Sequence, residues 1–557
     1  MSDLLNSASL VMIPSGYKED VVYSPIPTDG SGDLSFTRAS NGTRINSAGL
    51  VEVCPWNFVE QSNTFNTTWV SAGSGATITS GQTDPNSGSN AWLLSKLGQT
   101  GRIQQTVNVG GVQTFFIFAK KNTSDYILIN VFDGTTSHEC WFNLSTGVVG
   151  TQNSSTGTIE SFGNGWFKCS VTSTNLVASG IIQIYQSDGN GNVTGTSGSI
   201  FIFNSQLNIG STAKPYFPTT DRLNVPRLTY QNGGGGCPSL LLEKQSTNYM
   251  PYSENISLWY APADGVTLTS NTTDTVSPDG TNNASKIAIV SGSKRSYEIT
   301  NSVAGVGTFS AYVKAGTSTS ITLFTSSGSI NIGYNLSTLA ITTGSGTGTI
   351  TSVGNGWYRI TATNTLGASE VLQVLYTGTA GQTIYIWGFQ VEASSYVTSY
   401  IFTNGASATR VADSCSKTGI SSLIGSGTGT WFMDFEMVQG TGTGNPFAFD
   451  LSDGSTSNRL FLYWSEGVQT WYWGGADTSI TLPSTLRKKV AVKFSSGTAK
   501  LFCNGSSIST LSISSAFTQL DIGQRFSNAF PMDGKINEAY FLTTSLTDAE
   551  CQAITTI

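Results

Sequence analysis

The stretch TGTIESFGNGWFK at residues 156–168 returns as TGTITSVGNGWYR at residues 347–359, and nine of the thirteen positions are identical. Other phrases return in the same order at an offset of about 190 residues, among them TFFIFAKKNTS (114–124) with TFSAYVKAGTS (308–318). This period is far longer than a solenoid unit. The sequence therefore predicts a duplicated domain, with a first repeat at 52–222 and a second repeat at 243–410.

The composition indicates which fold the two repeats share. Charged residues make up 11% of the 557 residues, aromatic residues another 11%, and Gly occurs 62 times. Aromatic residues and Thr favour strands, and frequent Gly, Asn and Ser favour tight turns between them. We expect an all-β chain in which the repeats are tandem jelly-roll β-sandwiches.

Short connecting segments flank the repeats, and each carries an arginine near the module edge. Arg38 lies in FTRASNGTRINSAGLVE (36–52), Arg227 in VPRLTYQNGGGGCPSLLLE (225–243), and Arg410 in ATRVADS (408–414). We interpret these arginines as ties between a linker and the neighbouring domain, and ligand binding is the alternative.

From residue 428 the strands have no counterpart in the repeats. KKVAVKFSSGTAKLFCNGSSI (488–508) predicts a hairpin with a Ser-Gly turn, followed by a turn at Asn504-Gly505. Thr547 and Glu550 have the spacing of a helix-capping pair. Together with IGQRF, DGKINEAYF and SLTDAECQAI, these segments resemble the concanavalin A-like, laminin-G-like sandwich, which is the fold expected for 428–557.

The repeats resemble the carbohydrate-binding-module-like sandwiches of bacteriophage virion proteins. The resemblance rests on Asn248, Tyr252–Glu254, Trp259, Ser277–Gly280, Val313–Gly316, Gly354–Arg359, Tyr385–Gly388, Gln390, Glu392, Ala408–Arg410 and Ala412–Asp413. The opening LVMIPSGYKEDVVYSPIPTDGSGDLSFTRAS (10–40) also resembles leaders of tail-fibre and head-fibre proteins. The resemblance implies a virion-docking leader at 1–51, linkers at 223–242 and 411–427, and a terminal sandwich at 428–557.

Charge and hydropathy exclude two classes of partner. The net charge is −7 and no Lys/Arg cluster is present, which argues against nucleic acid. No apolar run is long enough for a transmembrane helix, and Asp3 stands where a signal peptide would be basic. We expect a protein assembled in the host bacterial cytoplasm. Its seven unpatterned cysteines are then mostly free thiols, with a Cys140–Cys169 pair left open.

Catalytic motifs are missing from the sequence. His138 is the one histidine, and neither a zinc motif nor a P-loop occurs, so we expect no catalytic residue, metal or cofactor. Two carboxylates could still hydrolyse a glycoside. Glu436, Asp450 and Asp453 lie in the terminal sandwich, but they do not form the Glu-x-Asp-x-x-Glu pattern of glucanases with this fold.

Tryptophans are the candidate sugar-binding residues. In the repeated phrase, alternation puts Trp166 and Trp357 opposite the core-facing residues, each two positions before a cation, Lys168 or Arg359, that could lie over its ring. We favour a role of both in the fold, and sugar stacking by Trp357 is the alternative. Trp464, Trp471 and Trp473 surround one predicted hairpin and form the best candidate sugar platform.

The leading hypothesis is a structural bacteriophage protein, a fibre or decoration subunit located in the virion. It would contact other virion proteins, form a trimer, and bind host surface polysaccharide weakly and multivalently without cleaving it. The alternatives are a phage glycan depolymerase, or another carbohydrate-active enzyme, and a bacterial surface adhesin.

Overall fold

The computed structural model describes residues 2–175, 180–259, 265–290, 295–300, 302–376, 378–424, 427–441, 444–474, 478–495, 497–513 and 517–557. Strand makes up 52% of the structure and helix 4%, which confirms the all-β prediction. The chain divides into two compact units, Pro55–Arg222 and a second unit of Met1–Cys54 with Leu223–Ile557. Among the described residues, no helix is both long and apolar enough to cross a membrane.

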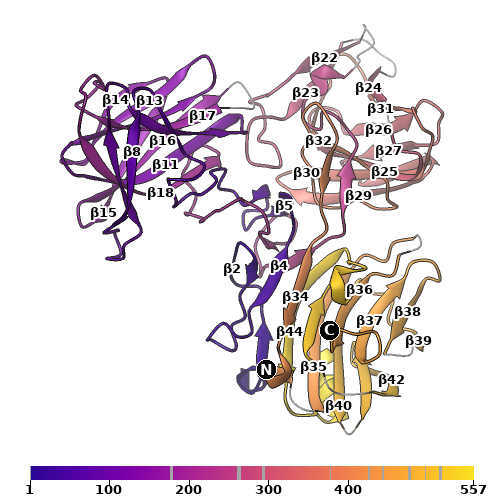
Figure 1. Cartoon of the computed structure of the whole chain (residues 1–557). Coiled ribbons are helices and arrows are strands. Elements are labelled where there is room, and N and C mark those ends of the chain that lie inside the picture. The colour runs from indigo at the N-terminus through magenta and orange to yellow at the C-terminus, as the bar shows by residue number, and fades with distance from the viewer. Residues whose placement is uncertain are drawn as a thin grey trace. The chain divides into compact units, whose positions relative to one another are not determined.

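The first repeat occupies the unit Pro55–Arg222, where the described strands form two antiparallel sheets (Figure 1). One sheet has the order β14 (Val148–Asn153), β13 (Ser137–Asn143), β12 (Tyr126–Phe132), β17 (Gly180–Ser187), β10 (Arg102–Val107), β7 (Val70–Ala72). The other has the order β15 (Thr156–Gly163), β16 (Trp166–Asn175), β11 (Gly111–Lys121), β18 (Ser199–Ile209), β9 (Ala91–Lys96), β8 (Ala76–Gln82). Inward residues of both sheets, such as Ile117 and Ile129, form its core.

The second repeat has the same strand order, as a duplicated domain requires, except that β7 has no counterpart among its described strands. One of its described sheets is β22 (Val266–Thr269), β23 (Ser285–Ile289), β32 (Thr383–Glu392), β25 (Gly305–Ala315), β30 (Trp357–Leu366), β29 (Thr347–Gly354). The other is β24 (Arg295–Thr300), β31 (Val371–Tyr376), β26 (Ser320–Thr325), β27 (Asn331–Asn335), β28 (Ala340–Ser345). A short ladder of β21 (Ser246–Asn248) with β33 (Ala408–Arg410) joins its two ends, and the 3-10 turn η1 (Ile256–Leu258) follows β21.

In each repeat, one buried asparagine side chain joins the first residues of the repeat to its last strand and to the segment after it. Asn57 and Asn248 have no exposed surface, and each side chain bonds to four backbone groups. The partners are Ser205 O, Phe217 O, Val59 N and Leu207 N in the first repeat, and Phe389 O, Ile401 O, Met250 N and Val391 N in the second. One amide thus ties the beginning of the repeat to its end, which satisfies backbone groups that burial would otherwise leave unpaired.

The terminal sandwich also consists of two sheets in the described part of the chain. The first is β19 (Arg227–Thr229), β20 (Ser239–Leu242), β44 (Gly534–Leu542), β35 (Thr428–Met437), β40 (Arg487–Ser495), β41 (Thr498–Cys503), β42 (Ser506–Ser512), with β1 (Leu10–Met12) on β44. The second is β2 (Tyr17–Lys18), β3 (Val21–Val22), β4 (Leu34–Thr37), β34 (Ser414–Thr418), β43 (Gln519–Ile522), β36 (Phe447–Ser452), β37 (Arg459–Ser465), β38 (Thr470–Trp473), β39 (Thr478–Ile480). The hairpin of β5 (Gly42–Ile45) and β6 (Val51–Cys54) forms a separate two-stranded sheet, and Ile45 hydrogen-bonds to Thr229 of β19. The remaining described helical segments are α1 (Ser2–Asn6), α2 (Ser421–Ile424), α3 (Asp548–Thr555) and the short turn η2 (Phe526–Asn528).

The leader and the linkers differ from the sequence-based prediction. The sequence predicts a separate docking leader at 1–51, but β1 pairs with β44, and β4 pairs with β34 (Figure 1). It predicts linkers at 223–242 and 411–427, yet these segments supply β19, β20 and β34 to the same sheets. These short strands complete the terminal sandwich because their apolar side chains, such as Leu10 and Phe36, enter its core.

The local predictions for the terminal sandwich are confirmed, except for the Ser-Gly turn, whose Ser496 lies outside the described residues. Strands β40 and β41 form the predicted hairpin. The next turn has positive φ at both central residues, 47° at Asn504 and 81° at Gly505, as a tight hairpin turn requires. Thr547 and Glu550 form a reciprocal capping box at the start of α3.

Candidate functional site

The proposed tryptophan platform of the terminal sandwich is buried. Trp464, Trp471 and Trp473 have exposed fractions of 7%, 3% and 0% and belong to the core between the two sheets. The sequence placed Trp471 and Trp473 on one face correctly, but that face packs on the opposite sheet. Side chains so enclosed offer no ring face to a sugar, so the platform prediction is wrong.

The repeated tryptophans are buried as well. Trp357 is 1% exposed, donates its indole N–H to Val276 O at 2.9 Å, and packs in a small cluster with Tyr312 and Trp387. Trp166 is likewise 1% exposed in the first repeat. Both lie opposite the main core, as alternation predicted, and their burial supports the role in the fold and removes Trp357 as a stacking residue.

The predicted cation–π contacts go to other rings. Arg359 lies 5.3 Å from the centre of the Tyr312 ring, and Lys168 lies 4.8 Å from that of Phe116. Tyr312 is the direct cross-strand neighbour of Arg359. For Arg359, this direct partner is closer than a residue two positions away on the same strand, because successive same-face side chains are separated by two residue rises. Lys168 is directly opposite Phe118, so Phe116 is its diagonal neighbour.

The three connector arginines meet in one buried arginine cluster, which confirms their interpretation as ties. Arg38 Nη1 lies 2.8 Å from Asp413 Oδ1, and Arg227 Nη2 bonds to the other carboxylate oxygen, Oδ2. Arg227 Nη1 lies 2.6 Å from Glu243 Oε2, and Arg410 Nη1 lies 3.2 Å from the same oxygen. The arginines are at most 1% exposed. The cluster therefore joins the leader, the second repeat and the terminal sandwich within their unit.

The electrostatics of the arginine cluster favour the ionised pairs. Burial alone would raise the pKa of Glu243, but Arg410 and Arg227 lower it to about 2. Burial lowers the pKa of Arg38, and Asp413 opposes that shift. Paired charges of this kind make removal of one partner costly, because the remaining charge stays buried.

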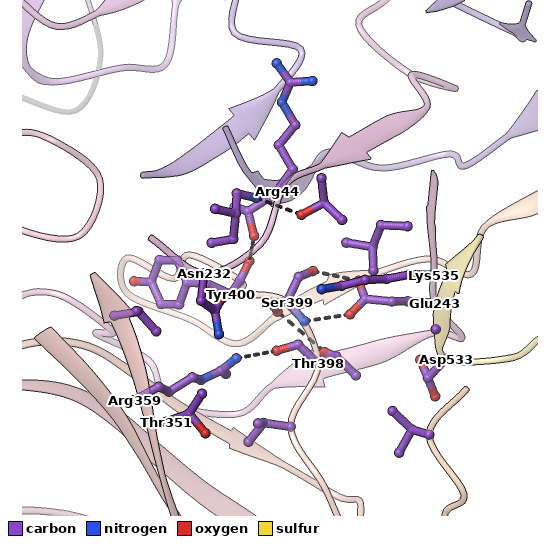
Figure 2. Close-up of a pocket in the computed structure, with 18 of the residues that line it drawn as sticks. Arg44, Asn232, Glu243, Thr351, Arg359, Thr398, Ser399, Tyr400, Asp533 and Lys535 are labelled. Atoms are coloured by element: carbon purple, nitrogen blue, oxygen red, sulfur yellow. Dashed lines mark hydrogen bonds between the residues drawn. The ribbon is translucent and has the colours of Figure 1, made fainter. Parts of the chain in front are cut away.

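A cavity of about 330 Å³ lies beside the arginine cluster, between the second repeat and the terminal sandwich (Figure 2). We call it the composite pocket. Strands β29 and β30, the hairpin β5–β6, segment 397–400 and the ends of β35 and β44 supply its walls. Seven threonine and serine side chains line it: Thr43, Thr229, Thr349, Thr351, Thr361, Thr398 and Ser399. The charged side chains in the lining are Arg44, Arg359, Lys535, Glu243, Glu436 and Asp533.

Several charged groups of the composite pocket are held by protein partners. Arg359 Nη1 donates to Thr398 O at 2.7 Å, and Glu243 accepts from the backbone N–H of Ser399 at 2.7 Å (Figure 2). The guanidinium of Arg44 points away from the other labelled side chains and donates to Glu52 at 2.8 Å. These bonds fix the shape of the pocket before any ligand enters.

The opposite wall carries Glu436 and Lys535, which are cross-strand neighbours on β35 and β44. Both are half-buried. Asp533 lies two residues before Lys535, and burial, opposed by Lys244, raises its pKa to about 6. Tyr396 donates its hydroxyl to Asp533, and the backbone N–H of Lys244 donates to it at 2.9 Å. Glu436 and Lys535 are thus the charges of this wall best placed to meet a ligand.

The other candidate residues named from the sequence lie outside this pocket. Asp450 lies on β36 and pairs across the strands with Asp521, and exposed Asp453 accepts from the backbone of Ser455. His138 is buried, with Nδ1 2.7 Å from Ser154 O. Glu436, Asp450 and Asp453 therefore do not converge as a catalytic set. All seven cysteines are free, including Cys140 and Cys169.

Sequence reasoning missed the residues of the composite pocket, although one signal was present. Thr349 and Thr351 alternate within the quoted phrase and lie on the solvent side of β29. The matching residues of the first repeat are Thr158 and Glu160, so the repeats differ at this position. No local sequence pattern indicates that β35 and β44 line the pocket, because their place beside the second repeat depends on how distant segments pack.

No family model and no curated protein matches the chain. Among solved structures, the CBM40 of Ruminococcus gnavus IT-sialidase bound to alpha2,3 sialyllactose is 19% identical, covering 25% of this chain and 86% of that one, with a TM-score of 0.20. The CBM22-1–CBM22-2 tandem domain of Paenibacillus barcinonensis Xyn10C is 12% identical, covering 61% and 98%, with a TM-score of 0.20. Trypanosoma rangeli sialidase is 10% identical, covering 93% and 97%, with a TM-score of 0.22. Similarity this low assigns no function to this chain.

Proposed function

We propose that this protein is a non-catalytic, glycan-binding structural protein of a bacteriophage virion. The observation that carries glycan binding is the composite pocket with its seven threonine and serine side chains. The virion assignment rests on the resemblance of the opening segment and the repeat motifs to fibre and decoration proteins. Its partners are then other virion proteins and a host surface polysaccharide.

The lining favours a neutral, hydroxyl-rich ligand. Three basic side chains (Arg44, Arg359, Lys535) and three acidic ones (Glu243, Glu436, Asp533) balance in formal charge. Six of the seven threonine and serine hydroxyls already bond to protein groups, all except Thr351. A hydroxyl oxygen has two lone pairs, so these side chains can still accept from the hydroxyls of a sugar. The cavity of about 330 Å³ lies at the small end of ligand pockets, which suits a short portion of a glycan chain.

Weak binding is expected at each copy of this site. The rings of Tyr312 and Tyr400 line the pocket, but they are 3% and 4% exposed and provide little stacking surface. Useful attachment would then come from many copies on one particle, because linked sites raise avidity without new contacts.

A glycan-cleaving enzyme is the second candidate function. Glu436 and Asp533 line the same pocket, and the raised pKa of Asp533, about 6, is a property of catalytic acids. However, both oxygens of the Asp533 carboxyl group already accept hydrogen bonds, from the Tyr396 hydroxyl and from the backbone N–H of Lys244. We favour binding without cleavage.

The test is binding of the full chain to an array of bacterial surface polysaccharides, with reducing ends measured in parallel. Thr351→Phe would fill the pocket, and we expect it to weaken binding at least about tenfold. Thr342→Phe is the matched control, because Thr342 is exposed on β28 and outside the lining. Equal binding by both variants would contradict the pocket assignment, and released reducing ends would make the protein an enzyme.

A further inference from the structure

The hairpin that holds Trp471 and Trp473 carries a second set of aromatic side chains on its other face. Because Trp471 and Trp473 of β38 enter the core, Tyr472 between them points to the outer side of the sheet. Tyr463 of β37 is its cross-strand partner. Both tyrosines are half-buried, and neither belongs to the core between the two sheets. The accessible aromatic side chains of this hairpin are therefore its tyrosines.

Four rings form a continuous stack on this outer face, which we call the aromatic row. The ring centres of Tyr472 and Tyr463 lie 5.1 Å apart with 13° between their planes, and Tyr463 lies 4.8 Å from Phe447 of β36 with 24°. Phe530 adds the fourth ring, 6.1 Å from Phe447 at 32°. Strands β36, β37 and β38 are neighbours in the sheet, so the row crosses them (Figure 1). Stacked rings cover each other's faces, so the two ends of the row decide what a ligand meets.

At the β38 end, one ring face of Tyr472 has no aromatic partner among the described residues. The cross-strand neighbour of Tyr472 on β39 is Ser479, which is exposed and has a small side chain. Adjacent strands lie about 4.8 Å apart, close to the ring spacing within the row. The position over Ser479 thus corresponds to one further ring of the stack. The C–H face of a sugar ring packs on an aromatic face through dispersion contacts, so it suits this position.

The opposite end of the row is held in a strained conformation. Phe530 is 41% exposed and has a φ of 53°, a region that bulky residues rarely adopt. Its carbonyl accepts a hydrogen bond from the backbone N–H of Phe447 at 3.1 Å, which fixes the ring beside the row. Strained residues persist only where their surroundings impose the conformation, and they cluster at ligand-binding sites.

Arg525 lies beside Phe530 and has donors without acceptors. Its guanidinium carbon is 5.7 Å from the centre of the Phe530 ring and 4.8 Å from that of Phe526. Arg525 acts on Asp450 from a distance, but Asp450 is paired with Arg459 at 3.5 Å. The Nε of Arg525 is buried with no hydrogen-bond partner in the described part of the chain. Since a guanidinium only donates, this end of the row favours a ligand rich in acceptors.

The acidic side chains of this face are withdrawn from a ligand. Asp450 and Asp521 have no exposed surface, and Gln519 and Gln524 donate to Asp521 at 2.7 and 3.2 Å. Arg525 is half-buried, so among these charges it is the one that a ligand reaches. A carboxylate matches it best, because a guanidinium can donate two parallel N–H bonds to the two carboxylate oxygens.

We propose that the outer face of the terminal sandwich binds a carboxylate-bearing polysaccharide along the aromatic row. One sugar ring stacks on the free face of Tyr472, and a carboxylate further along the chain pairs with Arg525. The rings between these ends are spaced 4.8–6.1 Å apart, so a single sugar residue does not reach both. The site shares no residue with the composite pocket and does not depend on it.

The test is binding of the full chain to oligomers of galacturonate, glucuronate and mannuronate, with maltohexaose as the neutral probe. We expect an acidic probe to bind more tightly than maltohexaose, and added salt to weaken it because its pair with Arg525 is ionic. Arg525→Gln should reduce this binding at least about tenfold, since charge-assisted hydrogen bonds are the strong ones. Arg102→Gln is the matched control, because Arg102 is also half-buried and lies 5.3 Å from an aromatic ring, that of Tyr185, in the first repeat.

Tyr472→Leu should weaken binding of the acidic probe about fivefold, because the row loses its free aromatic face while an apolar side chain remains. Tyr472→Phe retains the ring and should bind like the unmodified protein. Arg525 lies outside the apolar core, so Arg525→Gln decides the matter if Tyr472→Leu does not fold.

Unchanged binding in Arg525→Gln, a preference for maltohexaose, or no binding to any of the three acidic probes would overturn the proposal. Thr351→Phe, which fills the composite pocket, should leave binding of the acidic probe unchanged. A loss in Thr351→Phe equal to that in Arg525→Gln would place the acidic chain in the composite pocket and remove it from the aromatic row. Conversely, a composite pocket that binds no glycan would leave the effects of Arg525→Gln and Tyr472→Leu as expected here.

Discussion

Arg38 and Asp413 stand 375 residues apart in the chain and form an ion pair of 2.8 Å with no exposed side-chain surface. This bond links the segment before the first repeat to the segment after the second. Asp413 also binds Arg227, so one carboxylate holds the arginines of the two connecting segments 36–52 and 225–243. The stability of the second unit therefore depends on a few buried ion pairs as well as on its apolar core.

Replacing Asp413 with Asn should destabilise the second unit strongly. Arg38 and Arg227 would remain buried with one charged partner fewer, and breaking a buried pair typically costs about 3–5 kcal/mol. Denaturant unfolding followed by hydrogen exchange in β44 measures the effect. Asp548→Asn is the control, since Asp548 pairs with Lys493 and Lys500 on the surface. An equal loss in both variants would contradict a special role for Asp413.

Glu243 should make this unit sensitive to acid. Its pKa is lowered from 4.5 to about 2, so its stabilising effect is complete above pH 5 and is lost as pH falls toward 2. The difference corresponds to about 3 kcal/mol at neutral pH. Glu243→Gln should lower the stability at pH 7 and show a smaller further loss between pH 5 and 2. Parallel pH profiles of the two proteins would show that Glu243 is not responsible.

Trp357→Ala and Trp166→Ala should each destabilise their own repeat. Both indoles are 1% exposed, and truncation of a buried Trp typically costs about 3–5 kcal/mol. Hydrogen exchange in β25 reports on the second repeat and exchange in β11 on the first. Trp357→Phe should recover part of the loss because it refills much of the cavity. Lost glycan binding without any loss of stability would instead support the stacking role.

The full chain should form a trimer. No heptad pattern is present to drive a coiled coil, so association must use β-surfaces, and weak glycan sites gain most from several copies. Light scattering should give three times the chain mass. A stable monomer, both alone and mixed with virion proteins, would rule out this expectation.

The sequence identified the elements whose causes are local. The repeated phrase revealed the duplicated sandwich, since both copies need the same strand order and the same glycine turns. The hairpin 488–508 and the Thr547 cap could be predicted because turn and cap geometry depend on adjacent residues. The role of Arg38, Arg227 and Arg410 as ties was inferred from their position at the seams.

Only the tertiary structure decided which face of each strand is buried and what the connectors join. Alternation put Trp471 and Trp473 on one side, but a strand does not reveal which side the second sheet covers. The leader strands pair with β34 and β44, several hundred residues later in the sequence. The composite pocket and the Asp450–Asp521 pair arise in the same way, from segments brought together by sheet order. Sequence periodicity records the alternation along one strand, whereas the identity of its neighbour is set by the packing of the whole unit.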